Sequence, residues 1–98
     1  MIRIIYRLEA ESDIEAAFDW YESREAGLGQ EFRAEIEAAQ TQIARSPQAF
    51  RAVLGNARRC FLRRFPYLLL FVEEGEDIVI LGCFHVRAST GTKRRRAR

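Results

Sequence analysis

The residues with the clearest chemical potential are arginines that alternate with aromatic residues in one short stretch. Residues 58–67 read RRCFLRRFPY, so four guanidinium groups stand within seven positions. Guanidinium groups pair with carboxylates and phosphates through two parallel hydrogen bonds, and they also stack on aromatic rings. If these residues are exposed together, the stretch would form a surface for an anionic partner.

Alternation within this stretch leaves two orientations open, because successive side chains of a strand point to opposite faces. One face carries two arginines and two phenylalanines, Arg59, Phe61, Arg63 and Phe65. The other carries the remaining arginines with a cysteine and a leucine, Arg58, Cys60, Leu62 and Arg64. If the cysteine and leucine enter the core, the first set forms an exposed Arg/Phe ladder. If the phenylalanines enter it, only ordinary surface arginines remain.

A second candidate pair, His85 and Arg87, stands at the end of the last apolar run and shares one parity. Histidine titrates near neutral pH and arginine can bind a phosphoryl oxygen, so the pair could perform acid–base chemistry beside a phosphate. The alternative is a structural role, in which His85 caps the strand end through a backbone hydrogen bond. Because the chain has one histidine and no neighbouring nucleophile motif, the structural role is favoured.

Other site chemistries leave no signature. The two cysteines, Cys60 and Cys83, stand in apolar runs, which predicts buried free thiols and a reducing compartment, the bacterial cytoplasm. With one histidine they do not complete a zinc site, and Gly27 and Gly29 do not form a phosphate loop. We expect neither a metal nor a cofactor.

Length and charge bound the class of protein. The 98 residues suit a single domain with a modest core, and no apolar run approaches the ~20 residues that span a bilayer. No signal peptide is indicated. Ten acidic residues lie between Glu9 and Glu37, whereas residues 45–64 hold six arginines and no acid. This charge asymmetry bears on which partners the protein attracts, and it says nothing about the fold. The basic residues 93–98 could attract nucleic acid, but only through phosphate charge.

The rest of the pattern predicts the elements that position these residues. Residues 2–8 read as a strand, and the Ser12-x-x-Glu15 capping box predicts the start of a helix. A second helix follows the Gly-Leu-Gly turn and ends at Pro47. Three apolar runs over residues 58–87 predict an antiparallel meander. We therefore expect an α+β, two-layer domain over residues 1–87, with one sheet covered by an antiparallel helical hairpin, and a basic, flexible tail over residues 88–98.

The ordered set of motifs is similar to a known family. The set comprises a first strand, Asp13-Ile14 at a helix start, Trp20-Tyr21-Glu22, the Gly-Leu-Gly turn before Phe32, Pro47, Arg58-Arg59, the segment Arg63-Arg64-Phe65-Pro66-Tyr67, and a last strand that ends in His85. Over about residues 2–87 it resembles the RelE/ParE superfamily of type II toxin–antitoxin toxins, closest to the ParE branch.

The resemblance implies a bacterial toxin that inhibits growth by binding DNA gyrase and is neutralised by a ParD-like antitoxin, usually encoded beside it, in a hetero-oligomer. It implies no membrane contact, and contact with nucleic acid only through the antitoxin. We expect the antitoxin to contact the arginines and aromatics of the candidate surfaces, Arg58, Arg59, Phe61, Arg63, Arg64, Phe65, His85 and Arg87.

Two alternatives stay open within the superfamily. A RelE-like member would cleave messenger RNA on the ribosome, with Arg59, Arg63, His85 and Arg87 around the scissile phosphate. An inactive member would only pair with its antitoxin. Because no tyrosine follows Tyr67 and Lys93 is the only lysine, the nuclease is the less favoured of the active forms. The chain also lacks the Arg, Pro and Trp pattern that often follows the last histidine in ParE-like chains.

Overall fold

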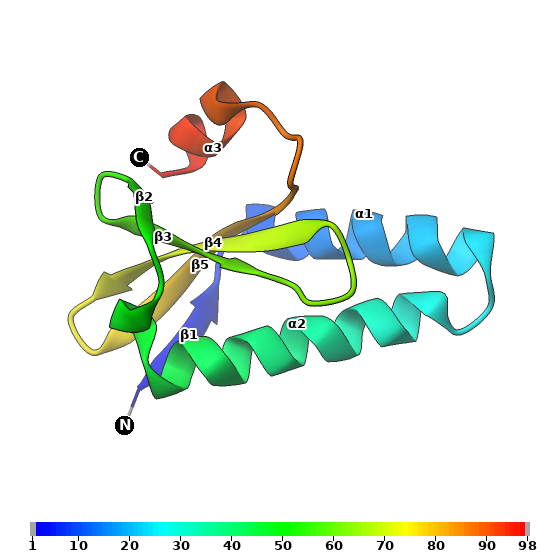
Figure 1. The fold of residues 1–98 in the computed structure, drawn as a ribbon, viewed down its shortest axis with the longest axis horizontal. Coiled ribbons are helices and arrows are strands. Elements are labelled where there is room, and N and C mark those ends of the chain that lie inside the picture. Colours follow the sequence, from blue (N-terminus) through cyan, green and yellow to red (C-terminus); the bar gives the residue numbers. More distant parts are fainter. Residues whose placement is uncertain (1, 98) are drawn as a thin grey trace.

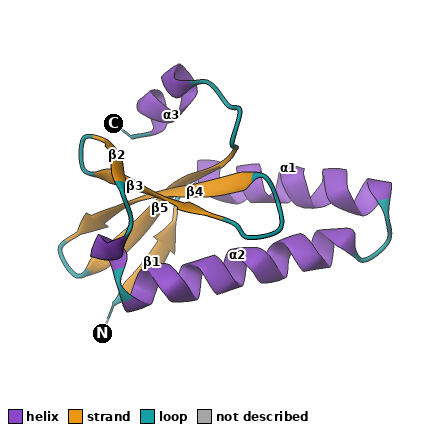
Figure 2. Ribbon diagram, viewed as in Figure 1, coloured by secondary structure: helices purple, strands orange, loops and turns teal. Residues whose placement is uncertain are grey.

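The structure is a computed structural model that describes residues 2–97 (Figure 1). Its elements follow in the order β1 (Arg3–Tyr6), α1 (Leu8–Arg24), α2 (Leu28–Arg45), a 3-10 turn (Pro47–Ala49), β2 (Ala52–Leu54), β3 (Ala57–Phe61), β4 (Tyr67–Glu74), β5 (Asp77–His85) and α3 (Thr90–Arg96). Helices and strands separate into distinct layers (Figure 2). The predicted α+β class is confirmed.

The five strands form one sheet in the order β1-β5-β4-β3-β2. The meander β3-β4-β5 is antiparallel, as the sequence predicts, and β1 pairs with β5 in parallel. Strand β2 was not predicted. It is only three residues long and pairs with β3 through a tight turn in which Gly55 has a φ of +60°, a conformation that glycine adopts without strain.

The predicted start of the first helix is wrong. Helix α1 begins at Leu8 rather than near Ser12, and Arg7 at its N-cap makes no side-chain capping bond. The Arg7 amide instead donates to the carbonyl of Ile80 at 3.1 Å, which ties the chain to β5. The Arg7 carbonyl then accepts the first helical bond from the Glu11 amide. Pairing with a distant strand, and not a local capping box, therefore sets where the helix starts.

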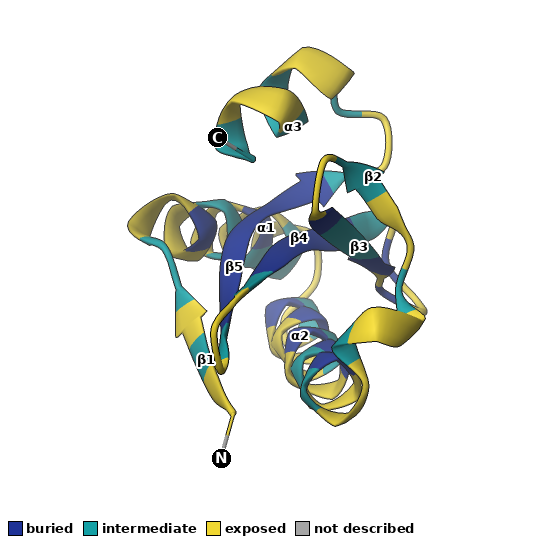
Figure 3. Cartoon of the chain, turned by 90° about the vertical axis from the view of Figure 1, so that its left-hand side faces the viewer, coloured by how far each residue is buried: buried dark blue, intermediate teal, exposed yellow. Residues whose placement is uncertain are grey.

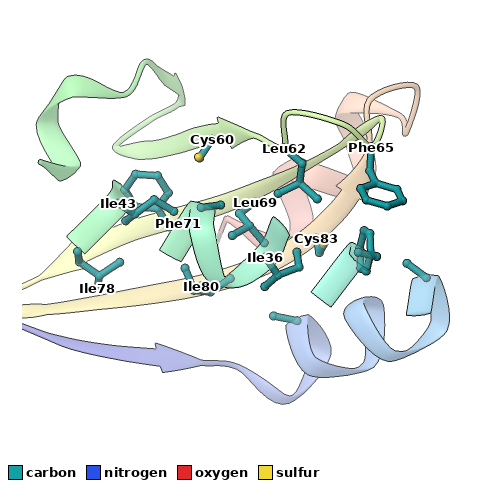
Figure 4. Close-up of a cluster of buried hydrophobic side chains, with 14 residues drawn as sticks. Ile36, Ile43, Cys60, Leu62, Phe65, Leu69, Phe71, Ile78, Ile80 and Cys83 are labelled. Atoms are coloured by element: carbon teal, nitrogen blue, oxygen red, sulfur yellow. The ribbon is translucent and has the colours of Figure 1, made fainter. Parts of the chain in front are cut away.

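The main core lies between the sheet and the α1–α2 hairpin, which covers one face of the sheet (Figure 3). Phe32 and Ile43 of α2 meet Leu69, Phe71 and Ile80 of the central strands, and all five side chains are fully buried. Figure 4 shows how the labelled side chains from β4 and β5 point towards those of α2. This arrangement confirms the predicted helical cover.

A second apolar cluster lies on the other face of the sheet. It consists of buried side chains from β3, β4 and β5, namely Ala57, Leu68, Leu70, Val72, Val79, Leu81 and Phe84. Val53 and Leu54 of β2, with Ala88 and Ala97 beside α3, pack against it. Strands β4 and β5 are apolar on both parities because both of their faces are covered. The sequence predicts two layers, one sheet and one helical hairpin, and it does not predict that α3 covers part of the second face of the sheet.

The tail contains a helix that the sequence did not predict. The sequence predicts a flexible extension over residues 88–98, whereas residues Thr90–Arg96 form α3 over the second cluster (Figure 3). Ser89 caps this helix, since its hydroxyl accepts the Thr92 amide at 3.2 Å. Ala97 adds an apolar contact with the sheet. How far the segment moves in solution stays a prediction.

The buried cysteines provide a test of the core. Both thiols are free, and burial raises the pKa of Cys60 to about 11 and that of Cys83 to about 12, the latter also through the Asp13 carboxylate. Only the thiolate attacks a disulfide reagent. At pH 8 the native protein should therefore react with Ellman's reagent roughly 100-fold more slowly than the unfolded chain, and faster as the pH rises above 10. Equal rates before and after denaturation in guanidinium would contradict this packing.

Candidate functional site

The arginine-rich stretch begins on β3, where the first of the two orientations is confirmed. Cys60 is buried on the side of the helical hairpin, so Arg59 and Phe61 point to the opposite face, the side of α3. The Arg59 Cζ lies 4.8 Å from the centre of the Phe61 ring, and Phe61 is 50% exposed. This cation–aromatic pair, held on a strand, is available to a partner.

The predicted ladder ends at Phe61, and the part that includes Phe65 is wrong. Strand β3 stops there, and the chain turns through residues 62–66. Phe65 is only 8% exposed, with its ring centre 4.8 Å from that of Tyr21 and 5.4 Å from that of Phe32. Alternation along a strand cannot extend through a loop, so Phe65 falls into the core instead of beside Phe61.

Carboxylates of α2 hold this loop in place. Glu35 Oε1 accepts the amides of Arg63 and Arg64 at 3.0 and 3.1 Å. The Arg64 guanidinium forms an ion pair with Glu31. Arg58 is also used internally, since its Nη1 donates to the Phe50 carbonyl at 2.6 Å. Among residues 2–97 the ion pairs use Arg3, Arg64 and Arg96, so Arg59 and the exposed Arg63 are in none.

His85 has the structural role that the sequence favours. Its Nδ1 accepts the Arg87 amide at 3.1 Å, and its ring packs 5.3 Å from that of Tyr67. Strand β5 ends at His85 and the chain then turns, so Arg87 does not share a strand face with it. With Trp20, Tyr21 and Pro66, the two rings line a hollow of about 400 Å³.

The nuclease cluster that was considered as an alternative is divided by the sheet. His85 pairs with Tyr67 on the side of the helical hairpin, whereas Arg59 pairs with Leu70 on the side of α3. The two side chains therefore do not converge on one phosphate-sized site. This arrangement suits a binding surface better than a catalytic centre.

Sequence reasoning missed one charged group, the pair between Asp13 of α1 and Arg96 of α3. The guanidinium donates to the carboxylate twice, at 2.7 and 3.1 Å, and both side chains are about four-fifths buried. The same carboxylate accepts the Cys83 amide at 3.0 Å, and Arg96 Nη1 donates to the Leu81 carbonyl at 3.0 Å. The hydrogen bond to Asp13 raises the pKa of Arg96 above its ordinary value, so the guanidinium stays charged.

These contacts satisfy an edge of β5 that has no strand beside it. Strand β1 pairs with β5 only as far as Ile80. The register then shifts, with Leu70 opposite Gly82 and Phe71 opposite Ile80, so Leu81 is the extra residue of a bulge. The only sequence signal for this site is a glycine within an apolar run, at position 82.

Gly82 gives a direct test of this arrangement. A Cβ there would lie 2.6 Å from the Phe84 ring and 2.7 Å from Arg96 Nη1, so one of them must move. We expect Gly82→Ala to lower the free energy of unfolding by ~1–3 kcal/mol, measured by urea denaturation.

Gly91→Ala on α3 is the matched control, because the nearest atom to its Cβ would be 3.8 Å away. Alanine is the better helix former, so this change should be neutral or stabilise the protein by ~0.5–1 kcal/mol. Equal effects of the two substitutions would show that Arg96 does not lie against Gly82.

Within residues 2–97, no helix combines the length and apolar character that a membrane crossing requires. In the same range, no cluster of three or more His, Cys, Asp or Glu side chains is placed to hold a metal ion.

The fold is similar to that of a solved structure described as the chromosomal ParDE TA system from P. aeruginosa, with a TM-score of 0.64 and 19% sequence identity, over 87% of this chain and 96% of that chain. At this identity the likeness establishes the fold alone. No curated protein sequence matches the chain significantly.

The sequence defines the family. Residues 4–88 match the family described as ParE toxin of type II toxin-antitoxin system, parDE, and the chain belongs to this family. The resemblance to the ParE branch is therefore confirmed. The matched range begins at the second residue of β1, includes all of the remaining strands and ends before α3.

Proposed function

We propose that this protein is the growth-inhibiting toxin of a bacterial toxin–antitoxin pair, that it acts in the cytoplasm by binding DNA gyrase, and that a ParD-like antitoxin neutralises it in a hetero-oligomer. The observation that carries the proposal is the match of residues 4–88 to the ParE toxin family. The similar structure from P. aeruginosa is itself described as a ParDE system.

Action by binding, without catalysis by the toxin itself, agrees with the distribution of the candidate residues. A general acid–base site needs its groups within hydrogen-bond reach of one reacting atom. Arg59 and His85 lie on opposite faces of the sheet, and the His85 Nδ1 already accepts a backbone amide. Neither observation favours an endoribonuclease centre on this chain.

The surface that we propose for the antitoxin is the part of the predicted set that remains accessible. It centres on Arg59, Phe61 and Arg63, with Arg87 exposed beyond the end of β5. Phe65 is buried, and Arg58 and Arg64 make internal contacts, so these three contribute through positioning. Glu31 and Glu35 of α2 reach the loop, where they bind Arg64 and two backbone amides, but the Arg59 and Arg63 side chains take part in no ion pair among residues 2–97. Their positive charge therefore stays available at this margin of the sheet. An acidic antitoxin segment would be steered to it and fold upon it.

The proposed target, DNA gyrase, is tested by a supercoiling assay. The purified toxin should inhibit supercoiling by DNA gyrase, and stoichiometric antitoxin should restore it, because the complex covers the toxin. A ribosome-dependent cleavage assay on messenger RNA is run beside it and should show intact RNA. RNA cleavage that His85→Ala abolishes, with gyrase unaffected, would replace this proposal with the nuclease.

The antitoxin surface is tested by charge reversal. Arg59→Glu combined with Arg63→Glu should weaken antitoxin binding by ~10–100-fold at low salt and less at high salt, because steering by surface charge is screened. Isothermal titration calorimetry measures the affinity. Arg24→Glu combined with Arg45→Glu makes the same change in net charge on the helical hairpin and serves as the control. Unchanged affinity of the first variant would remove the basic margin from the interface.

A further inference from the structure

The β2–β3 hairpin and α3 lie on the face of the sheet opposite the helical hairpin (Figure 3). The residues that line the space between these two elements form a groove. Two adjoining hollows form it, and both are lined by Val53 and Leu54. Thr90, Lys93, Arg94 and Ala97 line the other side. Their spacing of i, i+3, i+4 and i+7 places them on one face of a helix, so α3 forms one wall along its length.

The floor of the groove is apolar and its rim is cationic. Leu68 and Leu70 of β4 form the floor and are almost completely buried. The cations on the rim are Arg59, Lys93 and Arg94. None of these three cations takes part in an ion pair among residues 2–97. The residues that line the groove come from two stretches of the sequence, 38–72 and 78–98, and neither stretch contains an aspartate or glutamate. A partner that complements this surface would present a carboxylate to the cations of the rim and, beside it, an aliphatic group to the apolar floor.

The shape of the groove favours a polypeptide over a small molecule. The hollow over Leu68 and Leu70 has a volume of about 130 Å³, and the adjoining hollow has about 380 Å³ but is shallow and open to solvent. Pockets for small molecules usually measure ~300–1,000 Å³ and enclose their ligand. The smaller hollow can take one side chain, and its continuation past Gly55 and Arg94 leaves room for the neighbouring residues of a segment.

The lining also favours protein over nucleic acid. Single-stranded nucleic acids bind through a basic surface combined with aromatic rings on which bases stack. The lining residues of both hollows are aliphatic, small or cationic, and none is aromatic. The nearest exposed ring, Phe61, already has the Arg59 guanidinium over it.

We propose that this groove receives a segment of the antitoxin in which an aspartate or glutamate stands beside a leucine, isoleucine or valine. The aliphatic side chain packs on Leu68 and Leu70, and the carboxylate lies between Arg59 and Lys93. This inference rests on the proposed antitoxin partner and specifies where and by what chemistry it binds. The Asp13–Arg96 pair holds the α3 wall in position. That wall lies outside residues 4–88, the range of the family match.

Two substitutions on the same helix test the groove. Lys93→Glu reverses a charge on the rim, whereas Arg95→Glu makes the same change at an exposed residue that does not line either hollow. Binding of the antitoxin encoded in the neighbouring reading frame is measured by calorimetry at low salt, with circular dichroism to verify folding. We expect Lys93→Glu to weaken binding at least ~10-fold and Arg95→Glu less than ~3-fold.

Photo-crosslinking gives a second measurement that does not depend on charge. A benzophenone amino acid in place of Leu54 should capture the antitoxin, and the same group in place of Thr41, an exposed residue of α2, should not. If the antitoxin binds but the two charge variants are equal and Leu54 captures nothing, the groove proposal is overturned and the proposed function stands.

The remaining outcomes are equally decisive. If the wild-type toxin does not bind the antitoxin, both the groove proposal and the proposed partner fall. If Lys93→Glu leaves antitoxin binding unchanged but abolishes binding to a single-stranded oligonucleotide, the occupant is nucleic acid and the proposed polypeptide is wrong.

Discussion

The structure depends on how one strand edge is satisfied. Strand β5 has β1 beside it only as far as Ile80, and beyond this point its backbone groups need other partners. A buried backbone group without a partner costs ~1–3 kcal/mol, so a bare edge here would oppose folding. Asp13 accepts the Cys83 amide and Arg96 donates to the Leu81 carbonyl. Because these two side chains also pair with each other, the same contacts join α1, the sheet and α3.

The acidic and basic parts of the sequence lie on opposite faces of the sheet. Strands β4 and β5 are apolar on both faces, so each face requires a cover. The cover on one side is the acid-rich helical hairpin, and the cover on the other is the basic α3 with the β2–β3 hairpin. Two sides of opposite charge allow the molecule to orient a charged partner before contact. The Asp13–Arg96 pair crosses between them at the edge of β5.

The sequence predicts those parts of the fold that local periodicity determines. The two helices and the meander follow from apolar patterns that repeat within single elements. Alternation also predicts that Arg59 and Phe61 lie on the face opposite Cys60, but it does not decide which face meets the core. The start of α1 could not be predicted because the carbonyl of Ile80, distant in the sequence, fixes it. Strand β2 is too short to show alternation, and α3 has few apolar residues.

In the candidate site, too, local periodicity predicts some positions and contacts distant in sequence decide others. Arg59 and Phe61 share one face of the sheet, as alternation predicts, because both belong to β3. Phe65 lies beyond the end of that strand, and contacts from Glu35 and Tyr21, distant in sequence, decide its position. The groove beside α3 is formed by residues 53–97, and no local pattern reports that β2 and α3 face each other.

The parallel pairing of β1 with β5 has a consequence for biosynthesis. Arg3 lies opposite Asp77, a separation of 74 positions, so the first strand of this sheet in chain order pairs with the last. Contacts of such high sequence separation form late, and they slow folding. The hairpins of the meander can form while the chain is still growing, but the edge of β5 stays open until Arg96 has been synthesised. A nascent chain without α3 therefore lacks the contact that Arg96 makes with the Leu81 carbonyl.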